Sequence, residues 1–305
     1  STKQEQQELL NIVIVGGGAT GIEVAGILSE MKKFVLPNDY PDMSSSLMHI
    51  YLIEAGPRLL AGMSEESSAH AEQFLREMGV NILLNKRVVD YRDHKVVLED
   101  GTEIATRTFI WVSGVTGVTI GNLDASLIGR GGRIKVDSFN RVEGMNNVFA
   151  IGDQCIQLAD ENYPNGHPQL AQVAIQQGEL LAKNLIRMEK GQEMKPFHYR
   201  NLGSMATVGR NRAVAEFSKV KMQGWFAWVM WLVVHLRSIL GVRNKVIVLL
   251  NWVWNYFTYD QSMRMIVYAR KAKEIRDREK VEETTHWGKE LVQEEKNPSI
   301  TSSSK

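Results

Sequence analysis

The sequence predicts an α/β fold with a parallel sheet in its first part and amphipathic helices in its last third. Apolar runs at residues 12–15 and 49–53 have the length and composition of buried strands, and a helical pattern separates them. Residues 219–259 contain five Lys or Arg, no Asp or Glu, and five of the seven tryptophans of the chain. These observations predict a sheet domain followed by helices that lie against an apolar environment.

The first apolar run leads directly into a glycine-rich turn. Gly16, Gly18 and Gly21 have the G-x-G-x-x-G spacing, Gly17 lies between the first two, and a helical pattern follows. In such a turn the first glycine allows the bend, the second lets a pyrophosphate approach the backbone, and the third lets the helix pack closely. The free N–H groups at the helix start favour phosphate. We therefore predict a dinucleotide-binding site at this turn.

The second apolar run ends at Glu54, where a carboxylate can accept hydrogen bonds from the hydroxyls of an adenosine ribose. Its spacing from Gly16 exceeds the usual ~20 residues, and we attribute the excess to an inserted loop at residues 32–47. A carboxylate here repels a 2′-phosphate, so NADH is favoured over NADPH. Arg58 could reverse that preference, and a solvated glutamate without a ligand is the alternative.

The remaining patterns predict a chain of short elements. Ser64 is expected to cap a helix at 65–78, and a strand is expected to end at Gly152–Asp153 before a glutamine-rich helix. The other predicted elements are a strand at 80–84, an antiparallel excursion at 88–91, 95–98 and 103–104, buried strands at 109–112 and 147–151, and a helix from 168 to about 188.

Composition excludes several classes of protein. The chain has 305 residues, enough for two domains, and its net charge of +1 gives no reason to expect a nucleic-acid partner. Cys155 is the single cysteine, which excludes an intrachain disulfide, a C-x-x-C redox pair and a cysteine-rich metal site. We expect no metal site, and we expect Cys155 to be a small core residue rather than a nucleophile.

The tryptophan-rich segment from Trp225 to Trp254 is interpreted as a membrane-associating region. Its apolar runs at 225–234 and 246–253 are far shorter than the ~20 residues that span a bilayer. Tryptophan prefers the headgroup level, and lysine and arginine favour anionic lipid. The runs are therefore predicted to be helices in the membrane interface, with a further basic helix at 264–280. A tryptophan-rich core or a dimer interface is the alternative.

Four motifs, in this order and with the amphipathic C-terminus, resemble the type II NADH dehydrogenases, which are non-electrogenic NADH:quinone oxidoreductases of the FAD/NAD-linked reductase superfamily. They are Gly16-Gly-Gly-Ala-Thr-Gly-Ile-Glu23, Phe109-Ile-Trp-Val-Ser-Gly114, Asn147-Val-Phe-Ala-Ile-Gly-Asp153 and Ala171-Gln-Val-Ala-Ile-Gln-Gln177. The resemblance implies a flavoprotein fold with two dinucleotide-binding domains. It divides the chain into a polar lead (1–8), a Rossmann-like NADH domain (9–118), the second segment of a split FAD domain (119–205), a C-terminal membrane-associating region (206–275) and a disordered tail (276–305).

The resemblance also assigns roles to single residues. Glu23 matches a glutamate near the nicotinamide, and Gly114 matches the glycine that lets nicotinamide and flavin approach one another. The positions that match cofactor-binding residues are Gly16, Gly17, Gly18, Gly21 and Glu54 for NADH and Gly152, Asp153, Ala171 and Gln172 for FAD. Gln172 and Gln176 match the glutamines between the flavin and the quinone, so they join Glu23 as expected catalytic residues. Gln154 departs from the family, because it replaces the cysteine that commonly follows Gly-Asp.

The activity that the resemblance implies is hydride transfer from NADH to FAD, followed by transfer of two electrons to a membrane quinone without proton pumping. A homodimer on the cytoplasmic side of the cell inner membrane is expected. Such enzymes carry two glycine fingerprints and this sequence has one, so we expect an N-terminally truncated chain that binds NADH and retains FAD poorly. Two alternatives remain open: a flavin reductase with a soluble protein acceptor, and a non-catalytic NADH-binding membrane module.

Overall fold

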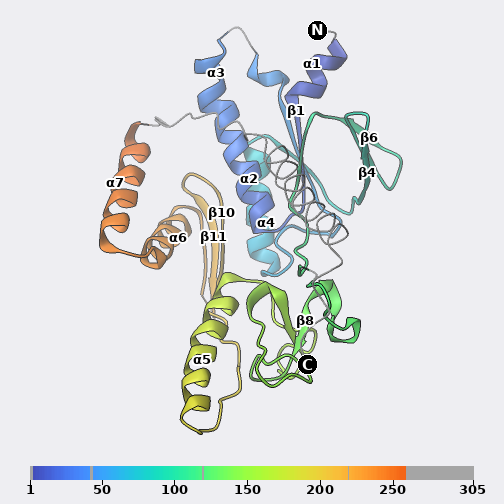
Figure 1. Cartoon of the computed structure of the whole chain (residues 1–305). Helices are drawn as coiled ribbons and strands as arrows, with labels where there is room; N and C mark the ends of the chain where they lie inside the picture. The colour runs from blue at the N-terminus through green and yellow to red at the C-terminus, as the bar shows by residue number, and fades with distance from the viewer. Residues whose placement is uncertain (1–2, 42–43, 119, 219, 259–305) are drawn as a thin grey trace, which may run out of the picture. The chain divides into compact units, whose positions relative to one another are not determined.

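The computed structural model describes residues 3–41, 44–118, 120–218 and 220–258 (Figure 1). The chain forms two compact units, residues 1–249 and residues 250–305. Within the second unit, only residues 250–258 belong to the described part of the chain.

A four-stranded parallel sheet forms the centre of the first unit. Its strand order is β3-β2-β1-β7, and each neighbouring pair is parallel. The parallel arrangement brings the carboxyl ends of the strands to one edge, which is the edge where ligands bind in open α/β sheets. The strands are β1 (Asn11–Val15), β2 (His49–Ile53), β3 (Val80–Leu83) and β7 (Thr108–Trp111).

Alternation along β1 gives the sheet two covered faces. Ile12 and Ile14 pack with α2 (Ala19–Glu30) and α4 (Glu65–Glu77), and Val13 and Val15 pack on the opposite face. That second face is covered by an antiparallel meander, as Figure 1 shows with β4 and β6 on the other side of β1 from α2. The meander, predicted from sequence, consists of β4 (Val88–Arg92), β5 (Lys95–Leu98) and β6 (Glu103–Ala105).

Two predictions for this part of the chain need correction. The expected loop at 32–47 is helical over much of its length, as a π-helix at Met31–Val35, α3 at Leu36–Asp39 and a 3-10 turn at Ser45–Leu47. The polar start of the chain, for which no secondary structure was predicted, forms α1 (Lys3–Leu10), and Arg107 pairs with Glu8 across 3.1 Å. The last residue of β7, Trp111, is 55 % exposed, so this strand is not buried as expected.

The middle of the chain contains a second, smaller parallel pair, β8 (Ile134–Val136) and β9 (Cys155–Gln157). The strand predicted at 147–151 is absent, and that stretch contributes only a single bridge between Arg141 and Phe149. Short 3-10 turns surround the pair, at Ala125–Leu127, Arg130–Gly132 and Gly152–Gln154. Cys155 is buried in the core of this pair, as predicted. The glutamine-rich helix, α5, spans Ala171–Glu189 and begins three residues later than expected.

An antiparallel sheet that the sequence did not predict follows α5. Its strands are β10 (Ser204–Gly209), β11 (Arg212–Phe217) and β12 (Val220–Gln223). One face packs on the helices of the first sheet through Ala206, Val208 and Val214. The contact is close, because a Cβ at Gly26 of α2 would lie 1.7 Å from the backbone oxygen of Val208. On the opposite face, Ala213 and Ala215 pack with Ala227 of α6 (Gly224–Ser238).

The two apolar runs that follow are helical, as predicted, and longer than predicted. They form α6 (Gly224–Ser238) and α7 (Val242–Thr258). Of the helices that the structure describes, none is long and apolar enough to cross a membrane. The basic helix predicted at 264–280 and the tail at 276–305 lie outside the described residues.

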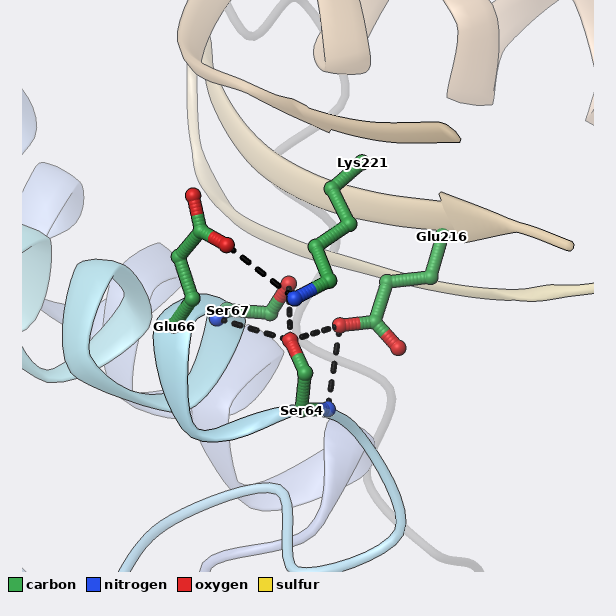
Figure 2. Close-up of polar contacts among 5 residues, drawn as sticks. All are labelled: Ser64, Glu66, Ser67, Glu216 and Lys221. Atoms are coloured by element: carbon green, nitrogen blue, oxygen red, sulfur yellow. Dashed lines mark hydrogen bonds and ion pairs between the residues drawn. The ribbon is translucent and has the colours of Figure 1, made fainter. Parts of the chain in front are cut away.

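Polar contacts join the N-terminus of α4 to the antiparallel sheet (Figure 2). Ser64 caps α4 by accepting from the Ser67 N–H at 3.3 Å, as predicted, and its hydroxyl donates to Glu216 of β11. The Ser64 N–H also donates to Glu216 at 3.0 Å. Lys221 of β12 pairs with Glu66 at 3.1 Å. The first helical turn of α4 is therefore fastened to two strands that are distant in sequence.

Candidate functional site

The carboxyl edge of the parallel sheet gathers the residues that the sequence singled out. The glycine turn follows β1, Glu54 follows β2, and Gly114 lies three residues after β7. Backbone bonds hold these strand ends together, with the Gly16 N–H donating to the Ile53 carbonyl at 2.9 Å.

Each fingerprint glycine has a separate steric role. Gly16 has φ +117° and its added Cβ would lie 3.0 Å from the backbone nitrogen of Ser113. A Cβ at Gly21 would lie 1.8 Å from the Gly16 oxygen, so only glycine lets α2 start against the turn. Gly18 differs, because a Cβ there would meet no atom within 4 Å. The space above Gly18 is open to a ligand.

The N-terminus of α2 offers hydrogen-bond donors to that open space. Gly18 is the N-cap residue, and no side chain caps the helix. The first N–H groups of a helix have no partner within the helix, and the positive dipole end favours anions. The cradle at Gly18 thus fits the pyrophosphate of a dinucleotide.

Glu54 holds the glycine turn through hydrogen bonds to its backbone. Its carboxylate accepts from the Gly17 N–H at 2.6 Å and from the Gly56 N–H at 2.7 Å. The guanidinium of Arg58 donates to the backbone oxygens of Leu60, Ala61 and Met63 within its own loop. Arg58 is therefore committed to holding that loop, which argues against the reversal of cofactor preference that its charge suggested.

Glu23 lies one turn into α2 and faces β10. Its Oε1 accepts from the Thr207 hydroxyl at 3.3 Å and from the Thr207 N–H at 3.5 Å. Thr207 is a contact that sequence reasoning missed, because β10 itself was not predicted. Gly114 has φ +81° and open space at its Cβ position, as a close approach by a ligand requires.

A second cluster surrounds the turn at Gly152–Gln154. Gly152 has φ +65°, and its added Cβ would lie 3.2 Å from the Ala174 Cβ of α5. The Gly152 N–H donates to Oε1 of Gln177, a fully buried residue, at 2.6 Å. Gln177 therefore holds the turn, although the family resemblance assigned functional roles to Gln172 and Gln176 instead. A polar residue on the buried side of an amphipathic helix was the signal that could have identified it.

Buried polar groups brace the turn from other directions. Arg133, 9 % exposed, donates from Nε to the Cys155 oxygen at 2.6 Å and from Nη2 to the His167 oxygen at 3.1 Å. Gln154 exchanges two bonds with the Val118 backbone, at 2.8 and 2.7 Å. Burial raises the pKa of the Cys155 thiol above its ordinary value. A protonated thiol is a poor nucleophile, which agrees with a core role.

The exposed side of this turn has the chemistry to hold a flavin. Asp153 is exposed, and a carboxylate can accept from the hydroxyls of a ribityl chain. α5 begins beside it at Ala171 and no side chain caps it, so the N–H groups of Ala171 and Gln172 lack helical partners. These donors and this carboxylate fit a polar, hydroxyl-bearing cofactor.

The side chains of Gln172 and Gln176 turn toward the extended segment after α5. Gln172 donates to the Gly203 oxygen at 3.0 Å and accepts from the Leu202 N–H at 3.0 Å. Gln176 donates to the Arg200 oxygen at 2.9 Å and accepts from the Arg200 N–H at 3.0 Å. Each amide thus makes one donated and one accepted hydrogen bond with the backbone.

Comparison with known proteins agrees with this geometry. The family profile "Pyridine nucleotide-disulphide oxidoreductase" matches residues 1–178, and the profile "NDH2 C-terminal domain" matches residues 201–259. The chain is 35 % identical over 261 residues to the type II NADH:quinone oxidoreductase NdhA of Mycobacterium tuberculosis, covering 81 % of this chain and 54 % of the relative. It is 32 % identical to the internal alternative NAD(P)H-ubiquinone oxidoreductase A1 of Arabidopsis thaliana, covering 83 % and 52 %.

A solved structure has the same fold. The NDH2 of Plasmodium falciparum in complex with NADH superposes with a TM-score of 0.76 at 19 % identity, covering 85 % of this chain and 68 % of that chain. The chain spans about half the length of the curated relatives that it matches.

The profile match covers more than half of the chain, and the fold and the glycine cradle agree with it. One departure from the profile's name is that a chain with a single, buried cysteine has no internal redox disulfide. The chain belongs to the pyridine nucleotide-disulphide oxidoreductase family, and its relatives within that family are type II NADH:quinone oxidoreductases.

Proposed function

We propose that this protein oxidises NADH with FAD as its redox cofactor and passes two electrons to a quinone without pumping protons. The observation that carries the proposal is the open space at Gly18, in a turn where Gly16 and Gly21 leave no room for a side chain. The names of the relatives, which describe NADH:quinone oxidoreductases, support the same activity.

The nucleotide would lie along the carboxyl edge of the sheet. The turn of Gly16, Gly17, Gly18 and Gly21 would bind its pyrophosphate, and Glu54 would accept from the adenosine ribose while holding the Gly17 N–H. The Glu54 carboxylate would repel the 2′-phosphate of NADPH, and Arg58 is held by its own loop and would not offset that repulsion. NADH is therefore preferred over NADPH. The nicotinamide would lie toward Gly114 and Glu23.

FAD would be held at the second cluster, where Gly152, Asp153, Ala171 and Gln172 supply the donors and the carboxylate. When bound, it supplies the two-electron chemistry that links a hydride donor to a quinone. Glu23 would lie between the two cofactors as a group that positions the nicotinamide or holds a proton at its carboxylate. Gln172 and Gln176 would lie on the acceptor side of the flavin.

A quinone is insoluble in water, so the proposal includes a peripheral membrane position. Within the first unit, Trp225, Phe226 and Val233 of α6 are all about half exposed or more. Exposed aromatic and aliphatic side chains beside arginine and lysine are typical of helices in the membrane interface. We place the protein on the cytoplasmic face of the inner membrane, as a homodimer, and divide it into domains at the boundaries that the sequence predicted.

The test is the dependence of NADH oxidation on the electron acceptor. Protein with added FAD and phospholipid vesicles is mixed with NADH, and the loss of NADH absorbance is followed with either a short-chain quinone or a soluble acceptor protein. Oxidation that requires the quinone supports the proposal. Oxidation with the protein acceptor alone, or NADH binding without quinone reduction when FAD is present at a saturating concentration, would contradict it and favour one of the two alternatives.

A further inference from the structure

An extended segment runs back along α5 after that helix ends. It comprises residues 195–203, which we call the strap, and it contains neither helix nor strand before β10 begins at Ser204. Three side-chain amides of α5 each make a pair of hydrogen bonds with its backbone, and we call each pair a clasp. Gln172 makes its clasp at Leu202–Gly203, and Gln176 makes its clasp at Arg200.

The third clasp is made by Asn184. This residue donates to the Lys195 oxygen at 2.8 Å and accepts from the Lys195 N–H at 2.9 Å. Each amide donates one hydrogen bond to the strap and accepts one from it. Gln176 and Asn184 each bond the N–H and the C=O of a single residue, whereas Gln172 bonds the N–H of Leu202 and the C=O of Gly203. The three residues lie four and then eight positions apart, so they follow one ridge of residues spaced by four along α5.

The strap is also held by other parts of the chain. The Phe197 N–H donates to the Ser138 oxygen at 2.7 Å. Phe197 and Tyr199 are buried and pack with Val173 of α5. The strap is thus ordered by apolar packing as well as by hydrogen bonds.

The strap ends where the C-terminal sheet begins. Gln172 bonds the Gly203 oxygen, and an added Cβ at Gly203 would lie 2.4 Å from the Glu216 backbone oxygen of β11. β10 follows directly and carries Thr207, whose hydroxyl and N–H contact Glu23. The clasps therefore fix the point at which the chain enters the strand that faces Glu23.

Gln172 and Gln176 could act by touching a ligand or by holding the strap, and Asn184 distinguishes these two explanations. At 1.5 Å per residue it lies about 18 Å along the helix from Gln172. Asn184 is also 1 % exposed, so a ligand at Gln172 and Gln176 would not reach its side chain. What the three residues share is therefore their contact with the strap.

We propose that Gln172, Gln176 and Asn184 form an amide zipper, and that the two glutamines are positioning residues that act on the site through the backbone of the strap. The evidence for the amide zipper is its hydrogen-bond geometry. Only the inference that the zipper affects the reaction rests on the proposed function. Asn184 is the member of the set that no functional motif assigns.

Hydrogen exchange of the strap tests the zipper in the full chain without any ligand. Exchange is followed by mass spectrometry of the peptide that spans residues 195–203. Each clasp contributes two hydrogen bonds, so Gln176→Ala and Asn184→Ala should each speed exchange of the strap by on the order of tenfold. Gln73→Ala removes an amide that bonds only Glu77 on the surface of α4, so it should leave the strap unchanged.

A second variant should give a dependence of exchange on pH, which loss of packing alone would not produce. In Gln176→Glu, a protonated carboxyl still offers one donor and one acceptor, whereas a carboxylate loses the donor and repels the Arg200 oxygen. The strap should exchange as in the natural protein at about pH 3, where a glutamate with the ordinary pKa of about 4.3 is mostly protonated, and on the order of tenfold faster at neutral pH. Each rate is compared with that of the natural protein at the same pH.

The proposal is overturned if Asn184→Ala leaves strap exchange at its natural rate, or if Gln176→Glu behaves alike at both pH values. Failure of NADH oxidation would contradict the proposed function and leave these exchange rates unaffected, so the two failures can be told apart.

Discussion

Single residues at the strand ends both hold the backbone of the site in place and supply groups that can bind a ligand. Glu54 is an example. The sequence predicted a ribose contact there, and in the structure its carboxylate also accepts from the N–H groups of Gly17 and Gly56. The ligand contact could be predicted, because a carboxylate at a strand end beside a glycine turn is typical of such a contact. The bonds to Gly17 and Gly56 could not be predicted, because they depend on backbone angles of the loop that the local sequence does not determine.

Replacing Glu54 should therefore affect stability as well as cofactor choice. Glu54→Gln keeps one acceptor oxygen and places an NH₂ group against an N–H donor, which should lower the unfolding free energy by about 1–3 kcal/mol. Loss of the negative charge should also narrow the preference for NADH over NADPH. Chemical denaturation and titration with both nucleotides measure these effects.

Arg58 supplies the comparison for cofactor choice. Because its guanidinium bonds three backbone oxygens of its own loop, Arg58→Ala should lower the midpoint of thermal unfolding and leave the ratio of NADH to NADPH affinities unchanged. A large fall in NADPH affinity in Arg58→Ala would show that this side chain reaches the 2′-phosphate.

At the scale of elements, the strands of the first sheet and of the meander that covers it were predictable, and the other two sheets were not. Residues 12–15 and 49–53 are continuous apolar runs, because both faces of a parallel sheet are covered. β9 has only three residues, and its partner β8 lies about twenty residues earlier. β10, with the sequence SMATVG, has small residues that meet the close approach of α2 and no clear apolar alternation.

Two glycines in helices should respond oppositely to substitution by alanine. Gly26→Ala would place a methyl group 1.7 Å from the Val208 backbone oxygen, so it should destabilise the protein by about 1–3 kcal/mol or more. Gly178→Ala in α5 meets only the Ile151 side chain at an ordinary 3.7 Å, so its higher helix propensity should stabilise by about 0.5–1 kcal/mol. Equal effects in urea denaturation would contradict this account of the packing.

The fastening of α4 to β11 should make stability depend on pH. Burial alone would raise the pKa of Glu216, but hydrogen bonds from Ser64 and Ser67 hold it below its ordinary value. A lowered pKa in the folded state means that the stabilisation is complete above about pH 4.3, the unfolded value, and is lost as the pH falls through the folded value.

Glu216→Gln should therefore be less stable than the natural protein at neutral pH and should approach it in acid. Thermal unfolding across this pH range measures the difference. Glu66→Gln is the matched control, because it removes a pair with Lys221 whose side chains are 60 % and 46 % exposed, and exposed pairs contribute little. A gap between Glu216→Gln and the natural protein that stays constant into acid would contradict the assignment.

For the whole molecule, the amphipathic helices were predicted from composition, whereas the sheet that carries α6 was not. Phe226 and Val233 of α6 are 70 % and 57 % exposed. Phe226→Asp and Val233→Asp should weaken binding to anionic phospholipid vesicles and leave the fold intact. Val220→Asp changes a residue of β12 that is 56 % exposed and should leave vesicle binding unchanged. Equal sedimentation of all three variants with the vesicles would contradict a role of α6 at the membrane.

The proposed function depends first on nucleotide binding at the turn after β1. The most direct measurement is a titration of NADH against the natural chain, Gly18→Val and Gly62→Val. Both glycines have open space at their Cβ positions, so neither change should strain the fold. We expect saturable binding that Gly18→Val weakens by about tenfold or more and that Gly62→Val preserves. Equal NADH affinity in all three proteins would contradict the account.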